Sequence, residues 1–562
     1  MDTDFESKTT FQGLTFKLYR AEGSALLAFD LAPDLATRDF VGFSIEVRYP
    51  GADHWGALHN RLHFDYPPTP ERPRSFASTE APFQKFRWIH VPSQILPGVY
   101  RYRVTACYMG ADGALRKGVA VENQICLEAQ TISGFLNVGF TRGFASSQAY
   151  GDRFDNETRI LPPAGAAPRA YLDLDMAPFE AHYQWLGFEA RRLILQVLDQ
   201  VANDPQLTLD ALIYESKEPD ILRRLEQLGP RLRAIIDDHG EQGAADSCES
   251  LSAARLASAG AQVKRLHFSS QQHHKVLIVR RDGRAIRVLG GSTNFALRGL
   301  YIQSNNVLLF DDERVAGKFA EVFEAYWAAP MAFRKNPLSQ RWWVVRDRPG
   351  SKVSLCFAPH ADSGLSLDPI AASIEQASSS VLYSVVFLNL ISGNVRHSLD
   401  ELMQRALFSY GVAQRKGQLA VRKPDGSVGL LPFAYLASNA PAPFKAEWSG
   451  NAGNMVHSKF VVTDFNGVNP TVYTGSSNLA EGGEKNNGDH LIRIEDRRIA
   501  VVYAVEALRL FDHFHFRVNA SQPGALDTLR LAKPPAPGDK PWFDAYYRTG
   551  HVKMRDRELF VK

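Results

Sequence analysis

Two stretches of the chain carry the same polar side chains in the same order. Each begins with His-x-Lys and continues, nineteen residues after the histidine, with the serine of Gly-Ser-x-Asn. Imidazoles act as nucleophiles, acids or bases, whereas ammonium, hydroxyl and amide groups donate hydrogen bonds and suit an anionic ligand such as phosphate. The candidate residues are His273, Lys275, Ser292 and Asn294 in the first stretch, and His457, Lys459, Ser476 and Asn478 in the second.

The two stretches are parts of a longer internal repeat. One such motif alone would more often be a surface pair or a turn than a catalytic site. His273 and His457 are 184 residues apart, however, and ten identical pairs keep this spacing without a gap, which predicts two homologous halves. The other nine pairs are Lys275/Lys459, Gly283/Gly467, Gly291/Gly475, Ser292/Ser476, Asn294/Asn478, Gly299/Gly483, Asp312/Asp496, Arg314/Arg498 and Ala316/Ala500.

If the halves pack about a pseudo-twofold axis, the two clusters face each other across one ligand. One imidazole can then attack a phosphorus atom while the other protonates the leaving oxygen, and the two lysines neutralise the developing charge. This chemistry needs no metal and no cofactor. The four cysteines are scattered without a CxxC motif, which disfavours both a zinc site and a disulfide framework.

The second cluster, His457-x-Lys459 with Asp464 and then Gly475-Ser476-Ser477-Asn478, resembles the HxKxxxxD and GSxN signature of the phospholipase D superfamily. The first cluster resembles the other copy, and the resemblance covers about residues 131 to 520. It implies a metal-independent phosphodiesterase with a phosphohistidine intermediate and one active site built by both halves. The superfamily includes phospholipases, cardiolipin-type synthases, nucleases and DNA-repair phosphodiesterases, so the motif does not select a substrate.

The first half departs from the pattern at two places. Arg280 stands where the second half has Asp464, with Asp282 displaced by two residues as a support or as an ordinary turn residue. The resemblance implies that this aspartate is supportive, so we expect activity to be retained. Asn305 stands where the second half has Asp489, and the resemblance implies that Asp489 orients His457 while Asn305 or its neighbour Asn306 holds His273. The roles of the two histidines stay open at this point.

The elements that must position these residues follow from residue patterning. Residues 1–130 alternate as short strands separated by turns, which predicts an all-β sandwich like those of immunoglobulin or fibronectin modules. Alternating helices and strands then predict two α/β halves, residues 131–345 and 346–520, followed by a C-terminal tail, 521–562, docked on the body. The predicted elements include strands Ala25–Leu31, Val41–Tyr49, Leu209–Tyr214, Leu232–Asp237 and Val381–Asn389 and helices Asp220–Leu228, Pro369–Ala377 and Val395–Tyr410.

Composition leaves several functional classes open. The net charge of +3, from 64 basic and 61 acidic residues, lacks the excess expected of a nucleic-acid coat protein. No leader or membrane-spanning stretch is evident, which predicts a cytoplasmic monomer. The apolar loop Leu430–Phe444 is a buried segment or a lipid-facing lip, and with the resemblance it favours a phospholipid headgroup ester and peripheral membrane contact. The alternatives are a nuclease and a degenerate phosphate-binding scaffold.

Overall fold

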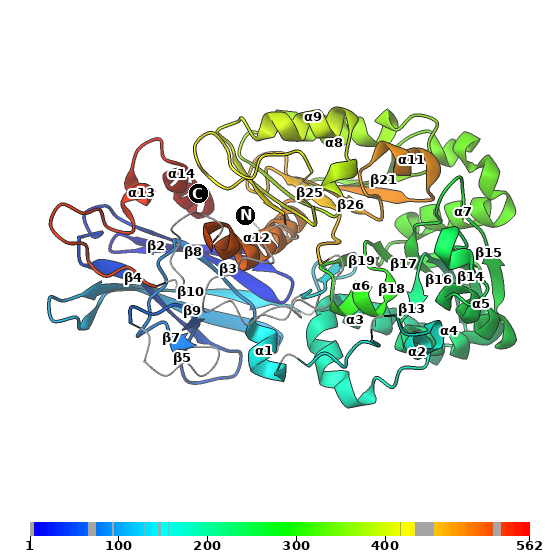
Figure 1. The fold of residues 1–562 in the computed structure, drawn as a ribbon, viewed down its shortest axis with the longest axis horizontal. Helices are drawn as coiled ribbons and strands as arrows, with labels where there is room; N and C mark the ends of the chain where they lie inside the picture. The colour runs from blue at the N-terminus through cyan, green and yellow to red at the C-terminus, as the bar shows by residue number, and fades with distance from the viewer. Residues whose placement is uncertain are drawn as a thin grey trace.

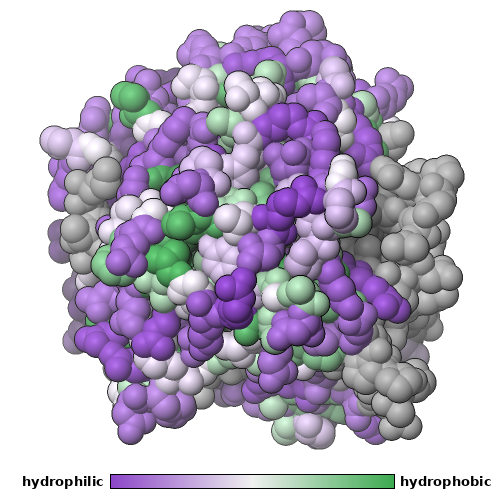
Figure 2. Space-filling view, turned by 90° about the vertical axis from the view of Figure 1, so that its left-hand side faces the viewer, coloured by the Kyte–Doolittle hydropathy of each residue, from purple (hydrophilic) through white to green (hydrophobic). Residues whose placement is uncertain are grey.

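The computed structural model describes residues 5–65, 75–92, 95–128, 130–143, 148–155, 157–163, 165–415, 417–432, 455–520 and 530–562, the side chains of 514–520 excepted. A β-rich module lies at one end of the molecule and two α/β modules at the other (Figure 1). The side formed by the β-rich module is mostly hydrophilic with scattered apolar residues (Figure 2).

The N-terminal module consists of two antiparallel sheets, as the strand pattern predicts. Their inner faces share one hydrophobic core, to which both sheets contribute alternate residues, for example Phe16 and Leu27 from one and Ile45 and Tyr102 from the other. The first sheet is β1 (Glu6–Phe11), β2 (Leu14–Ala21), β3 (Ser24–Leu31) and β8 (Arg87–His90). The second is β10 (Leu115–Leu127), β9 (Gly98–Met109), β4 (Phe40–Arg48) and β5 (Gly56–Ala57).

The first α/β module contains a seven-stranded mixed sheet. Its strands, in spatial order, are β11 (Leu136–Phe140), β19 (Asn306–Phe310), β17 (Arg284–Gly291), β16 (Lys275–Arg281), β12 (Leu207–Ile213), β14 (Leu232–Ile236) and β15 (Gln262–Arg265). Its principal helices are α3 (Glu180–Asn203), α4 (Pro219–Leu228), α5 (Cys248–Ser258), α6 (Leu297–Tyr301) and α7 (Glu313–Ala328). Two short helices, α1 (Gln148–Phe154) and α2 (Pro168–Leu172), precede them.

The second module repeats this topology with one added edge strand. Its order is β20 (Trp343–Arg348), β21 (Ser351–Phe357), β27 (His490–Glu495), β26 (Thr471–Gly475), β25 (Phe460–Thr463), β22 (Ser380–Val385), β23 (Phe408–Ala413) and β24 (Leu430–Pro432). From β21 onward each strand has the neighbours and the parallel or antiparallel sense of its counterpart in the first sheet. Among its described residues the helices are α8 (Gly364–Gln376), α9 (Gly393–Leu402), α11 (Glu481–Asn486) and α12 (Arg497–Ala520).

Three details of the second module differ from the sequence-based expectation. The predicted strand Val381–Asn389 is wrong at its end, because β22 stops at Val385 and a 3-10 turn follows at Leu388–Leu390. The predicted helix Val395–Tyr410 is wrong at its end, because the helix stops at Leu402 and strand β23 begins at Phe408. The guanidinium of Arg405 lies in the intervening turn and donates to the carbonyls of Ile374 and Glu375 at 2.9 and 3.0 Å, which anchors the turn to the end of α8. Strand β20 belongs to the second sheet although it begins before residue 346.

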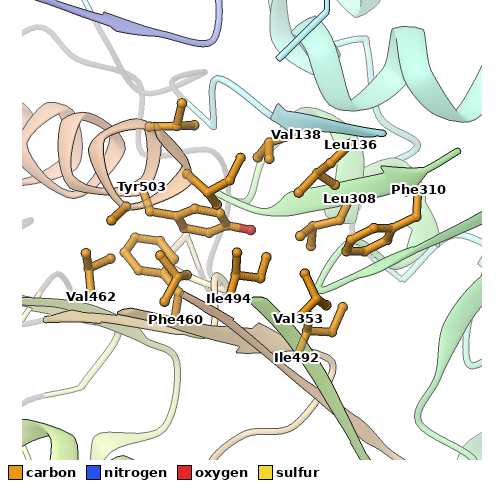
Figure 3. Packing of buried hydrophobic residues seen from close by; sticks show 14 of the residues in the cluster. Leu136, Val138, Leu308, Phe310, Val353, Phe460, Val462, Ile492, Ile494 and Tyr503 are labelled. Carbon is orange, nitrogen blue, oxygen red and sulfur yellow. The ribbon is translucent and has the colours of Figure 1, made fainter. Parts of the chain in front are cut away.

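The two halves share one hydrophobic core. Side chains of β11 and β19 point toward side chains of β21, β25, β27 and α12 (Figure 3). The cluster is buried on all sides, so separating the halves would expose a large apolar surface to water. The labelled residues are Leu136, Val138, Leu308, Phe310, Val353, Phe460, Val462, Ile492, Ile494 and Tyr503.

The C-terminal segment packs back onto the body. Aromatic residues around α13 (Asp544–Tyr547) join the core of the β-sandwich, and Phe560 of α14 (Val552–Val561) lies in the core shared by the halves. In the apolar loop, Leu430–Pro432 forms the buried edge strand β24, and the remainder of Leu430–Phe444 lies outside the described residues. No helix in the described part of the chain is long and apolar enough to cross a membrane.

Candidate active site

Main-chain hydrogen bonds join the two halves at the site in matched pairs. His273 N–H donates to the Gly488 carbonyl at 2.8 Å, and His457 N–H donates to the Ser304 carbonyl at 3.1 Å. In return, Gly488 N–H donates to the Gln271 carbonyl at 2.9 Å, and Ser304 N–H donates to the Met455 carbonyl at 2.7 Å. Each acceptor lies two residues before the histidine of its half. Each bond maps onto its partner by the repeat spacing, as in an isologous interface about a twofold axis. Both histidines therefore lie at the junction.

Each histidine is held by a residue of the opposite half. His273 Nδ1 lies 2.9 Å from Asp489 Oδ1, and His457 Nδ1 lies 2.9 Å from Asn305 Oδ1. The expected pairing of His457 with Asp489, and of His273 with Asn305 or Asn306, is therefore wrong. Sequence spacing within one half cannot reveal a partner that only half-to-half packing supplies. Because both acceptors contact Nδ1, neither of them occupies Nε2, the ring nitrogen that remains for chemistry.

The motif serines hold these supporting residues. Ser476 Oγ donates to Asp489 Oδ1 at 2.7 Å, and Ser292 Oγ donates to Asn305 Oδ1 at 2.8 Å. The glycine before each serine has φ near +148°, and a Cβ there would lie 2.4 Å or less from a carbonyl oxygen of the neighbouring strand. The Gly-Ser pair thus lets the hydroxyl reach the supporting residue, and this contact gives the motif serines a supporting role.

Both lysines are buried beside the histidines. Lys459 Nζ donates to the His457 carbonyl at 2.7 Å and lies 3.2–3.3 Å from both ring nitrogens, while Lys275 Nζ donates to the His273 carbonyl and lies 4.6 Å from the centroid of the Tyr214 ring. Burial lowers the pKa of Lys275 to about 7 and lowers that of Lys459 well below its ordinary value. Bringing an anion between them favours the charged ammonium forms.

Burial favours the neutral forms of both histidines. Burial, reinforced by Lys275, lowers the pKa of His273 to about 4, although Asp489 acts in the opposite direction. Burial and Lys459 also hold the pKa of His457 well below 6.5. The contact with His273, the charge of Lys275 and the hydrogen bond from Ser476 lower the pKa of the Asp489 carboxyl despite its burial, so this carboxylate stays ionised and accepts the Nδ1 proton of His273.

The lowered pKa of Lys275 predicts that the KM for an anionic substrate rises with pH. Above a pKa of about 7 the empty enzyme must take up a proton to bind, so KM should increase up to roughly tenfold per pH unit until the pKa of the complex is reached. KM for bis(p-nitrophenyl) phosphate, measured from about pH 6 to pH 9 around this pKa, checks the slope. Lys275→Arg, whose guanidinium stays charged, should flatten it. A flat wild-type profile would show that Lys275 is charged throughout.

Sequence analysis missed one carboxylate at the site. Asn294 Nδ2 donates to Glu215 Oε2, and Lys217 Nζ lies 3.4 Å from Glu215 Oε1. Glu215 follows the carboxyl end of β12, and its charge raises the pKa of both Lys275 and Lys459 against the effect of burial. The one signal in the sequence was that Glu215 lies just past strand β12, which pairs with the motif strand β16.

The two halves differ at this carboxylate. The pairing of Leu212 with Val276 in one sheet and of Ser384 with Phe460 in the other makes Phe387 the counterpart of Glu215. The Oδ1 atoms of Asn294 and Asn478 are both buried without a hydrogen-bond partner among the described residues. The first half thus has a carboxylate, Glu215, against its motif asparagine, whereas the second half has Phe387 at the equivalent position.

Asp464 lies away from the reacting groups. Its carboxylate accepts main-chain N–H bonds from Ser378, Ser379 and Ser380 at 2.7–3.1 Å, so it ties the end of β25 to the start of β22. In the first half Arg280 forms ion pairs with Asp210 at 2.6 Å and Glu324 at 2.9 Å instead. Asp282 has φ +51° next to Gly283 and is a turn residue. The substitution at Arg280 replaces one structural link by another.

A second pair of histidines lies beneath the site. His274 Nδ1 is 3.0 Å from His490 Nδ1, and His274 Nε2 is 3.0 Å from the hydroxyl of Tyr326. Because Tyr326 donates its proton to the Ala358 carbonyl at 2.6 Å, its oxygen accepts from His274, and His490 supplies the proton between the two Nδ1 atoms. His274 is structural, as expected. Within the described residues no group of three or more His, Cys, Asp or Glu side chains is arranged to hold a metal ion.

Comparison with known proteins agrees with the motif. Residues 206–327 match the family model described as "Cardiolipin synthase, PLD-like domain". A search of curated proteins gave no match. Among solved structures, phosphatidylserine synthase from Haemophilus influenzae has 14% identity and a TM-score of 0.42, with 58% of this chain and 85% of that chain covered.

Two other solved structures are similar over smaller parts. Nuc from Salmonella typhimurium, a phospholipase D family member, has 25% identity and a TM-score of 0.20, with 25% of this chain and 86% of that chain covered. Yeast tyrosyl-DNA phosphodiesterase has 12% identity and a TM-score of 0.30, with 54% and 85% covered. The match of residues 206–327 to the family model shows a phospholipase D-like domain within the first α/β half.

Proposed function

We propose that this chain, which carries a phospholipase D-like domain, is a phosphodiesterase that works through a phosphohistidine and acts on phospholipid headgroup esters. One observation carries the proposal. His273 and His457 are each fixed at Nδ1 by a residue of the other half, so both rings lie at one junction beside two buried lysines and neither supporting residue occupies Nε2. This arrangement suits in-line displacement at phosphorus.

His273 is the nucleophile in this proposal. Its Nε2 forms a bond to phosphorus while the bond from phosphorus to the leaving oxygen breaks, and the imidazole gains positive charge. The Asp489 carboxylate, 2.9 Å from Nδ1, stabilises that charge, whereas the neutral Asn305 amide gives His457 no such help. The asymmetry of the supports favours these roles, which the motif alone leaves open.

His457 is the acid and then the base. A bound phosphodiester anion favours the protonated imidazole, whose Nε2–H passes its proton to the leaving oxygen. In the second step His457 Nε2 takes a proton from water as the water oxygen bonds to phosphorus and the His273–phosphorus bond breaks. An alcohol in place of water would give transfer instead of hydrolysis. The two lysines hold the oxygens on which negative charge accumulates.

Two features support a lipid headgroup over a nucleic acid. The matching family model is described by a cardiolipin synthase, an enzyme of lipid chemistry. Glu215 also places a carboxylate against the motif amide of Asn294, which suits an ammonium group on the alcohol. Successive phosphates of a nucleic-acid strand need basic side chains along their path, and a carboxylate there opposes them.

Glu215→Gln tests the headgroup assignment. Glutamine keeps an acceptor for Asn294 but removes the charge, so kcat/KM for phosphatidylethanolamine should fall about tenfold relative to that for phosphatidylglycerol, the loss of one modest charge contact. Both lipids are assayed in mixed micelles with a chelator, beside labelled single- and double-stranded DNA. Glu249→Gln is the matched control, because Glu249 lies 3.8 Å from the same Lys217 but accepts a hydrogen bond from Ser216 N–H, not from Asn294.

The other outcomes separate the competing functions. Preferential cleavage of DNA, with a steep loss of binding in salt, would replace the lipid proposal by a nuclease. Equal losses on both lipids would leave Glu215 with a positioning role only. Binding of bis(p-nitrophenyl) phosphate without any turnover would identify a scaffold that retains phosphate binding alone.

A further inference from the structure

The outer face of the β-sandwich carries two neighbouring rows of polar residues with different charge balance. In the sheet of β10, β9, β4 and β5, directly opposite residues share a face. One row, Glu122, Arg103 and Glu46, alternates in sign. Arg103 lies 2.7 Å from the Glu122 carboxylate and 3.8 Å from that of Glu46, so its charge is compensated.

The adjacent row lacks such compensation. It consists of Gln124, Arg101 and Arg48, which places two guanidinium groups side by side on the same face. Neither arginine forms an ion pair with a carboxylate in the part of the chain that the structure describes. Like charges directly opposite each other destabilise a sheet, so an anion bound between Arg48 and Arg101 would stabilise it.

These two arginines also line a cavity. Its volume is about 440 Å³, and its other walls are Val99 and the turn Tyr49–Ala52. The turn closes by an Ala52 N–H bond to the Tyr49 carbonyl at 3.0 Å, with φ +76° at Gly51. Val99 is 43% exposed, so an apolar surface lies beside the two charges. Arg48 also lies 5.4 Å from the centroid of the Trp55 ring, which limits its freedom.

We propose that this cavity is a second ligand site, in which Arg48 and Arg101 together bind an oxyanion, a phosphate or carboxylate group. Guanidinium groups present planar donor pairs that match such anions. The apolar wall at Val99 fits a ligand whose anionic group adjoins a nonpolar part, such as a lipid headgroup or a small organic phosphate. The site is built entirely by the β-sandwich and shares no residue with the candidate active site.

Calorimetric titration of the full chain with inorganic phosphate tests the site. We expect wild type to bind one equivalent more than Arg48→Gln/Arg101→Gln, because the active site is intact in both. In low salt without phosphate the double variant should melt at the same or a higher temperature, because the like-charge contact is gone. With phosphate present, wild type should melt at a higher temperature than the double variant. Arg103→Gln, in the compensated row, should keep the extra equivalent.

Vesicle sedimentation distinguishes the two sources of the anion. Phosphatidylcholine vesicles with and without about one-third phosphatidylglycerol are compared, since binding to anionic lipid adds electrostatic attraction. If the source is a headgroup, wild type and Arg103→Gln sediment with the anionic vesicles and the double variant does not. If it is a soluble anion, none sediments and the calorimetric difference remains. Equal stoichiometry and affinity for phosphate in wild type and double variant overturns the site.

Discussion

His457→Ala is expected to trap a covalent phosphoenzyme that His273→Ala cannot form. With a good leaving group such as p-nitrophenolate, the attack by His273 needs no proton donor, whereas the second step lacks the base that activates water. A burst of one equivalent of p-nitrophenol followed by steady turnover slowed about 10²- to 10⁴-fold should appear in His457→Ala. Acid-quenched protein and mass spectrometry then locate the phosphoryl group on His273.

The matched substitution gives the opposite behaviour. His273→Ala should show neither burst nor covalent adduct, while still binding bis(p-nitrophenyl) phosphate through the lysines. His274→Gln, one residue along the chain and outside the reacting set, serves as the control for disturbance of the strand. Label found on His457 in the wild-type enzyme would reverse the two roles, and turnover in both alanine variants would remove the mechanism.

Exchanging the two supports should exchange the duties of the histidines. Asp489→Asn alone should lower kcat by roughly 10²- to 10⁴-fold, the scale seen when the carboxylate behind a catalytic histidine becomes an amide. Adding Asn305→Asp gives His457 the carboxylate, so the double variant should recover part of the activity and carry its phosphoryl group on His457. Recovery is partial because Asn305 Nδ2 also donates to the Gly299 carbonyl at 2.8 Å, a bond that a carboxylate cannot make.

Kinetics of the single variants separate support from substrate binding. Loss in kcat with KM unchanged places Asp489 behind His273, as its 2.9 Å contact indicates. A raised KM with full kcat would instead place the carboxylate against substrate. Ser476→Ala is a milder version of the same change, because it removes the 2.7 Å bond that holds Asp489 and leaves the carboxylate in place.

The repeat was predictable because each copy of its motif is a short pattern of residues close together in the chain. His-x-Lys and Gly-Ser-x-Asn recur at one spacing, and the glycine before each serine is fixed by a main-chain contact that a side chain would block. Antiparallel alternation likewise predicted the sandwich, since strands such as β3 and β9 contribute every second residue to the core between the sheets. These features depend on neighbours close along the chain.

The rest depended on packing between distant segments. Asp489 and His273 are 216 residues apart, and only docking of the halves brings them together. Glu215 carries no motif and becomes notable through its contact with Asn294. The helix predicted through Tyr410 failed because Arg405 ties a turn to another helix end. In each case the decisive partner lay outside the segment being interpreted.

Each half supplies the residue that supports the histidine of the other half, and this has a consequence for how the two-half chain evolved. In a dimer of two identical chains, a single genetic position supplies both supporting residues, so an aspartate behind one histidine would entail an aspartate behind the other. Joining the two copies in one chain frees these positions to mutate separately. The Asp489 and Asn305 pair is a difference of this kind. Covalent fusion, rather than the motif itself, therefore allows the two histidines to be supported by different residues.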